Sequence, residues 1–228
     1  MDRSRGGHRF YIAAQGRWAS RDPIGEDGGI LLYTFAANSP ILAYDAQGLL
    51  TLSWSGTLTS ENTVIYNWRN GVRYDIFGQT WVDKWDVDPS EDDADCEEGC
   101  TKLDVEGECV VTAWYNPSHA TAHEHEEDRV DAWEESWDQM GDAIADLEVG
   151  IPTECITDAK SACYADLVGA LAARWKQFGH VKQAEITVRD ATDEVVAQEG
   201  LSTLISRQWE LSSLDAEVSR LEAECKKK

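Results

Sequence analysis

The spacing of the apolar residues changes near Ser118, and this change constrains the fold more than any other feature of the chain. Before it, residues 51–115 contain runs rich in Val, Ile, Thr and aromatic residues, which are typical of β-strands. Asn70-Gly71 predicts a hairpin turn within this region, and we expect an acidic loop from Asp86 to Cys100. After Ser118 the apolar residues recur three and four positions apart, which predicts an amphipathic helix. Its apolar positions are Val130, Trp133, Trp137 and Met140.

Two more helices follow the first one. Gly150-Ile151-Pro152 ends the first helix, the second begins near Thr157, and the third spans roughly residues 190–225. One side of the third helix approximates a coiled-coil seam, which predicts packing against its own domain or against a partner helix. The seam consists of Leu204, Leu211, Leu214, Val218 and Leu221.

These patterns predict an α+β fold. We expect a short β-rich segment over residues 1–50 and a second domain over residues 51–228. In that second domain, antiparallel strands at about 51–115 would pack on a three-helix half at about 118–225.

The charge of the chain limits the classes of partner that it can bind. It carries 43 acidic and 20 basic residues, a formal net charge of −23, which argues against binding to nucleic acids or anionic membranes. No apolar run approaches the roughly 18 residues that span a bilayer, so we expect no membrane insertion. No apolar stretch follows the first residues, so we expect no conventional signal peptide. The sequence leaves the oligomeric state open.

Six cysteines occur without a Cys-x-x-Cys pair, which makes a structural zinc knuckle a poor fit. An even count with loose spacings favours disulfides in a protein that works outside the cytoplasm. Six reduced thiols in the core are the alternative. The sequence does not give the pairing.

The segment from Arg9 to Leu49, "RFYIAAQGRWASRDPIGEDGGILLYTFAANSPILAYDAQGL", resembles the end of the RHS repeat-associated core. The matching motifs are Gly16-Arg17-Trp18, Ser20-Arg21-Asp22-Pro23-Ile24-Gly25, Gly28-Gly29, Tyr33, Asn38, Pro40, Asp45 and Gly48-Leu49. Ile12-Ala13 and Ala46 depart from the pattern, because the family has Asp-Pro and Pro there. On its own residues, the segment is typical of short strands joined by tight turns.

The resemblance implies a function. In that family the core closes a large β-shell, and an aspartyl self-cleavage releases a variable C-terminal domain that is usually a toxin. The resemblance implies Asp22 as the first candidate for the cleaving aspartate, Asp45 as the second, and Leu49 as the residue before the cut. The alternative is that Asp22 and Asp45 are only turn residues.

The stretch after the strand "CVVTAWYNP" resembles zincin-like metallopeptidase effector domains, in which a strand precedes an H-E-x-x-H helix. In that motif two imidazoles four residues apart hold one Zn²⁺, and the glutamate is the general base. Aligned on the tryptophan that follows, "HEEDRVDAW" offers His125 as a ligand and Glu126 as the base. The second ligand is replaced by Arg129, which cannot bind zinc.

A second register keeps a complete ligand pair. "HEHEE" places His123 and Glu127 four residues apart, with Glu124 as the base. His180, on the second predicted helix, is the candidate third ligand for either register. The alternative without a metal is that these residues form only the acidic, solvent-exposed first turns of a helix, with the histidines on its surface.

The sequence therefore predicts the C-terminal cassette of an RHS-type polymorphic toxin, secreted or delivered to another cell. Its effector domain would resemble a zinc-dependent metallopeptidase, intact or degenerate, with a peptide or protein substrate and a cognate immunity protein. The alternative is a non-catalytic, disulfide-stabilised interaction or structural module.

Overall fold

The computed structural model describes the backbone in nine ranges. These are residues 3–6, 9–12, 17–18, 43–44, 50–69, 72–92, 96–147, 154–191 and 194–228. Side chains are described from residue 50 onward within these ranges, except at positions 67–69, 72, 74 and 195. All structural statements below concern these residues.

A long strand, β9 (Cys100–Tyr115), organises the main sheet. It lies between β5 (Thr51–Ser60) and β8 (Gly78–Asp92), and alternate residues such as Val105 and Val111 are buried on its inner face. This alternation follows from the two-residue repeat of a strand with one covered face. Short strands extend the sheet, with β10 (Ile156–Thr157) on β9 and β4 (Ala43–Tyr44) on β5.

Two smaller groups of strands complete the β-structure. β6 (Ile65–Arg69) and β7 (Val72–Ile76) form an antiparallel hairpin in which Arg69 pairs with Val72, which confirms the predicted hairpin. β1 (Arg3–Gly6), β2 (Arg9–Ile12) and β3 (Arg17–Trp18) form an antiparallel sheet near the N-terminus.

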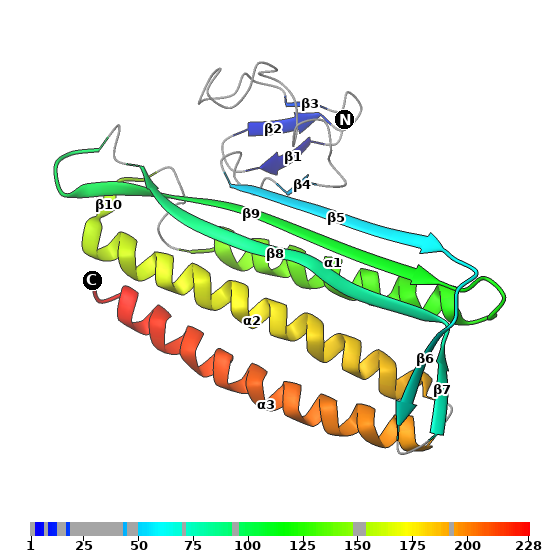
Figure 1. The fold of residues 1–228 in the computed structure, drawn as a ribbon. Helices are drawn as coiled ribbons and strands as arrows, with labels where there is room; N and C mark the ends of the chain where they lie inside the picture. Colours follow the sequence, from blue (N-terminus) through cyan, green and yellow to red (C-terminus); the bar gives the residue numbers. More distant parts are fainter. Residues whose placement is uncertain are drawn as a thin grey trace.

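Two of the described helices cover one face of the main sheet, and another lies beyond them on the side away from the sheet (Figure 1). α1 (Ala122–Ala145) and α2 (Asp158–Asp190) pack against the sheet and each other, and α3 (Glu194–Cys225) packs on α2. None of the described helices is long and apolar enough to cross a membrane.

Two tryptophans of α1 form the centre of the core. Trp133 and Trp137 are almost fully buried, and both meet the ring of Trp85 from β8 edge to face, at centroid distances of 5.7 and 5.0 Å. Two glycines make the room: a Cβ at Gly179 would lie 2.3 Å from the Trp133 ring, and one at Gly107 would lie 3.1 Å from the Trp137 ring. The predicted apolar stripe of the first helix is therefore confirmed as its core face.

The α+β class is confirmed, with two corrections to its details. β8 and β9 are antiparallel as predicted, but β5 and β9 run parallel. This is because the chain reverses between β5 and β8, and β9 then returns between them. The predicted loop from Asp86 is also wrong in part, since Asp86 to Asp92 continue β8 in register with β9. Pro89 is tolerated there because β8 pairs with a strand on one side only among the described residues.

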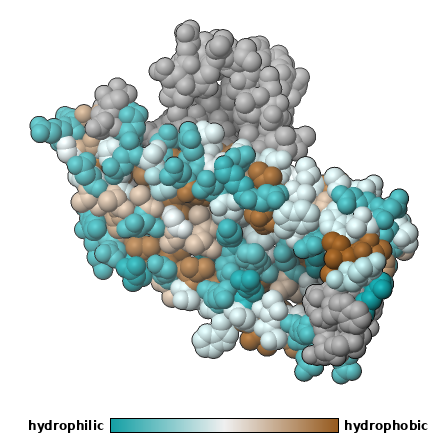
Figure 2. All heavy atoms as spheres, in the orientation of Figure 1, coloured by the Kyte–Doolittle hydropathy of each residue, from teal (hydrophilic) through white to brown (hydrophobic). Residues whose placement is uncertain are grey.

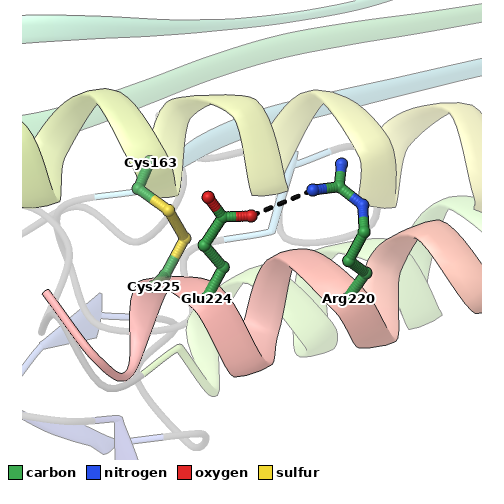
Figure 3. Close-up of a disulfide and its surroundings, with 4 residues drawn as sticks. All are labelled: Cys163, Arg220, Glu224 and Cys225. Atoms are coloured by element: carbon green, nitrogen blue, oxygen red, sulfur yellow. Dashed lines mark hydrogen bonds and ion pairs between the residues drawn. A yellow bond between two sulfur atoms is a disulfide. The ribbon is translucent and has the colours of Figure 1, made fainter.

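Two disulfides are formed, which confirms the expectation of disulfides. Cys96 is bonded to Cys155, and Cys163 on α2 is bonded to Cys225 at the end of α3 (Figure 3). Cys100 is a partly exposed free thiol. The Cys163–Cys225 bond fixes the C-terminal end of α3 to the first turns of α2.

Removing the bond between the helices should destabilise the fold. The bond closes a loop with a sequence separation of 62, so replacing Cys163 and Cys225 with Ala should lower the free energy of unfolding by about 4 kcal/mol. Urea unfolding followed by circular dichroism would measure this difference. Cys100→Ala is the control and should change it by less than about 1 kcal/mol. Equal stability of the double variant and the parent would contradict the role of this bond.

Candidate functional site

A short turn places the start of α1 beside the sheet. The Asn116 side chain accepts hydrogen bonds from the amide and hydroxyl of Ser118 and donates one to the Thr63 carbonyl. The His119 ring stacks on Phe77 at 4.3 Å. The helix begins only at Ala122, so His119 precedes it, and the histidines of the predicted motif lie in its first turns.

Glu126 is the deepest charged residue of this region, with 2% of its surface exposed. The Thr80 hydroxyl donates a hydrogen bond of 2.6 Å to one of its oxygens, and the Arg129 guanidinium lies 3.3 Å from the other. Arg129 also donates to the Thr187 hydroxyl at 2.8 Å. Gly78 leaves the space for this carboxylate, because a Cβ there would come within 2.6 Å of Glu126.

His125 is held by the end of α2. Its Nδ1 lies 2.6 Å from a carboxylate oxygen of Asp190, and its Nε2 lies 4.0 Å from Glu126. The hydrogen bond from Arg189, with a weaker one from His125, lowers the pKa of Asp190 to about 2. Asp190 is therefore a carboxylate at neutral pH, and the imidazole donates its Nδ1 proton to it. Arg189 also pairs with Asp128 and so ties α2 to α1 a second time.

These side chains line a cavity of about 1000 Å³. Its walls come from the end of β7 and the start of β8, the first turns of α1, the end of α2 and Val196 on α3. Five carboxylates and two guanidiniums face it, together with the apolar Phe77 and Ile76. The cavity can thus hold a ligand with both polar and apolar groups, beside the His125 imidazole that Asp190 orients.

The predicted site residues are not all brought together. Glu124, His125 and Glu126 line the cavity. The exposed side chains of His123 and Glu127 lie 3.5 Å apart on α1, and neither is among the residues that line the cavity. The predicted self-cleavage residues, Asp22, Asp45 and Leu49, lie outside the described residues.

His180 lies in the helical layer instead of the cavity. Its ring packs edge to face on Trp133 at 4.9 Å. Burial, with the nearby charges of Arg207 and Lys176, lowers its pKa to about 4. Its neutral ring is partly buried where α2 contacts Trp133 of α1.

The residues present do not fit a bound zinc ion. The guanidinium of Arg129 stands at the position of the second imidazole and pairs with the glutamate that would be the base. Among the described residues, no three His, Cys, Asp or Glu side chains are placed to hold a metal together. The zinc site therefore stays a prediction from the sequence.

Several residues of the site were missed in the sequence. Asp190 and Arg189 lie more than 60 positions from their partners on α1, and Thr80 lies 46 positions from Glu126. No local motif marks them. One feature of the sequence pointed to such partners. Glu126 lies one helical turn before the apolar stripe, so it falls on the core side of the helix, where a carboxylate needs a polar partner.

Comparisons with known proteins find similarity to toxins over short stretches. Over 43 residues, the chain is 49% identical to Toxin protein Tse5 of Pseudomonas aeruginosa, which is 19% of this chain and 3% of that protein. Over 48 residues it is 40% identical to Toxin subunit YenC2 of Yersinia entomophaga, which is 21% of this chain and 5% of that protein. The matches thus span a very small part of both relatives. No protein-family model matches the chain, and no solved structure matches it.

The Glu126–Arg129 pair should couple strongly in stability. Arg129→Met should lower the free energy of unfolding by about 3 kcal/mol, because it leaves a buried carboxylate without its cation. Adding Glu126→Gln should recover part of this loss, with a coupling of at least about 1 kcal/mol in urea unfolding. On the same helix, Glu127→Gln removes an exposed pair and should cost less than about 1 kcal/mol. Equal effects of Arg129→Met and Glu127→Gln would contradict this interpretation.

His180 should make stability depend on pH. Its pKa is about 4 in the folded chain, against an ordinary histidine value of 6.5, so the unfolded chain binds the proton first as the pH falls. The contribution of the neutral His180 ring to the free energy of unfolding is complete above about pH 6.5. It is lost as the pH falls from 6.5 to 4, and the loss is no more than about 3 kcal/mol. His180→Phe should flatten the unfolding free energy over this window, measured by urea unfolding at several pH values. His123→Gln should retain the slope, and a His180→Phe profile parallel to that of the parent would refute the assignment.

Proposed function

We propose that the chain is the C-terminal cassette of an RHS-type polymorphic toxin, with residues 1–50 as the end of the core and residues 51–228 as the effector domain. The observation that carries the proposal is the motif series from Arg9 to Leu49, a segment close in length to the stretches shared with two bacterial toxin proteins. The disulfides support a place of action outside the reducing cytoplasm. A peptide or protein substrate and a cognate immunity protein belong to the same proposal.

For the effector domain, we propose a degenerate zincin-like helix. α1 retains the histidine and glutamate of the motif, and an ion pair from Arg129 to Glu126 takes the place of the metal. The cavity and its oriented imidazole remain as the part of the domain that a substrate can enter. The intact metallopeptidase is the less supported form of this proposal, because its second imidazole is missing.

The second candidate is a non-catalytic interaction module. The exposed apolar residues of α3 favour it, since a secreted domain that only binds needs a surface of this kind and no reacting group. The two candidates differ in what happens when His125 is changed.

A growth assay separates the candidates. The full chain would be produced in a bacterial host, once in the cytoplasm and once with an export signal fused to it. We expect growth inhibition on export, because the disulfides form there, and we expect His125→Gln and Asp190→Asn to relieve it. The matched control His123→Gln lies outside the cavity lining and should remain toxic. Toxicity that survives His125→Gln would favour the binding module, and normal growth with a folded, exported chain would refute the toxin proposal.

Zinc content tests the degenerate helix. The parent chain should hold no zinc after purification, whereas Arg129→His should gain about one equivalent, because it restores two imidazoles four residues apart beside the Asp190 carboxylate. Elemental analysis gives the stoichiometry. Zinc in the parent that is lost in His125→Gln would instead support an intact metallopeptidase. No zinc in Arg129→His, with an unchanged circular dichroism spectrum, would refute the zincin-like relation.

A further inference from the structure

The outer face of α3 exposes large apolar side chains at regular spacing. Leu201, Ile205 and Trp209 are 48%, 50% and 77% exposed, and each follows the previous one after four residues. They therefore lie next to each other on one side of the helix. Figure 2 shows brown and pale side chains among teal ones along the lower edge of the molecule, where α3 runs in Figure 1.

This face is separate from the one that packs on α2. Val218, Leu221 and Cys225 are buried and belong to the core, so the predicted seam of this helix faces its own domain. The contact with α2 and the Cys163–Cys225 bond hold α3 in place. The outer face is thus presented on a fixed helix.

The outer face carries no charge over most of the helix, although the chain has a net charge of −23. We call this face the α3 stripe. Its positions, all exposed, are Gln198, Leu201, Ile205, Trp209, Ser212, Ala216, Ser219 and Ala223. The first four side chains are large and the last four are small. A stripe with one large half and one small half is complementary in shape to a second copy of itself in the opposite direction.

We propose that the α3 stripe binds the α3 stripe of a second copy of this chain, with the two helices antiparallel. The proposal goes beyond the toxin function and does not depend on it. A twofold axis between Trp209 and Ser212 places each large residue opposite a small one. The facing pairs are Gln198 with Ala223, Ile205 with Ala216, and Trp209 with Ser212, and Leu201 lies beside Ser219, one position from this register.

The charges at the two ends of α3 fit this direction. The same register brings Glu194, in the first turn of one helix, opposite Lys227, just beyond the end of the other. Antiparallel helices also bring the positive end of each helix dipole beside the negative end of its partner. A parallel pair would instead bring Glu194 to Glu194 and large residues to large residues.

The expected interface is small, so the association should be weak. The stripe is about 39 Å long at 1.5 Å per residue and about 10 Å wide. This footprint is about half of the roughly 800 Å² per partner in a standard interface. The net negative charge of each copy opposes association, and salt screens this repulsion. We therefore expect a monomer–dimer equilibrium that shifts towards the dimer at high salt.

Analytical ultracentrifugation of the full chain tests the association. Between about 5 and 500 µM, the average mass should rise from 25.4 kDa towards twice that value, and more steeply in 0.5 M than in 0.05 M salt. Trp209→Glu should keep the chain monomeric throughout. The control Ile65→Glu, at an exposed apolar residue of the β6–β7 hairpin, should dimerise like the parent. A parent chain that stays monomeric over this range would overturn the proposal. A parent chain whose association becomes weaker at high salt would overturn it too.

The variant Ala216→Trp distinguishes shape complementarity from nonspecific hydrophobic association. The change adds apolar surface but places a second large residue against Ile205 of the other copy, so it should weaken the dimer at least about tenfold. Adding Ile205→Ala should restore it. Dimerisation that Ala216→Trp strengthens would overturn the antiparallel pairing.

Cross-linking distinguishes an antiparallel from a parallel arrangement of the two α3 helices. In a Cys100→Ser background, copies with Ile205→Cys would be mixed with copies with Ala216→Cys and treated with a short bis-maleimide. We expect cross-linked dimers in the mixture and not with either variant alone. Cross-links within the Ile205→Cys sample alone would indicate a parallel pair and overturn the proposal.

Discussion

The seating of Trp133 and Trp137 between the sheet and α2 is the contact on which the rest of the structure depends. Both rings need neighbours without a side chain, and Gly179 and Gly107 supply them. A methyl group at Gly179 would collide with the Trp133 ring, and one at Gly107 would collide with Leu52 and crowd the Trp137 ring. Because the two rings fix the rotation of α1 about its axis, they also decide which residues of its first turns point inward.

The buried position of Glu126 is a consequence of that rotation. It lies on the core side of α1, where an unpaired carboxylate would cost several kcal/mol. Thr80 and Arg129 offset this cost by pairing with the carboxylate, and Gly78 leaves the space for it. A metal site of the H-E-x-x-H kind needs an imidazole where the guanidinium now lies. The ion pair between Arg129 and Glu126 therefore occupies the position where such a site would need its second ligand.

The third helix divides its two faces between folding and association. Its inner seam packs on α2 and is anchored by Cys225, as a coiled-coil pattern in a single domain predicts. Its outer face is uncharged in a strongly acidic chain, and its large residues from Leu201 to Trp209 remain in water. The adjacent exposed side chains of Leu201, Ile205 and Trp209 are the physical ground for the proposed pairing between two copies.

The sequence by itself determined the α+β class, the apolar stripe of the first helix and the hairpin, and it favoured disulfides, because each depends on local periodicity or composition. It also marked His125 and Glu126, which the structure places at one cavity. Only the tertiary structure decided the parallel pairing of β5 with β9, the extension of β8 through Pro89 and the partners Asp190 and Thr80. These depend on contacts between distant segments, whose register is set by packing of the whole core and leaves no local trace in the chain.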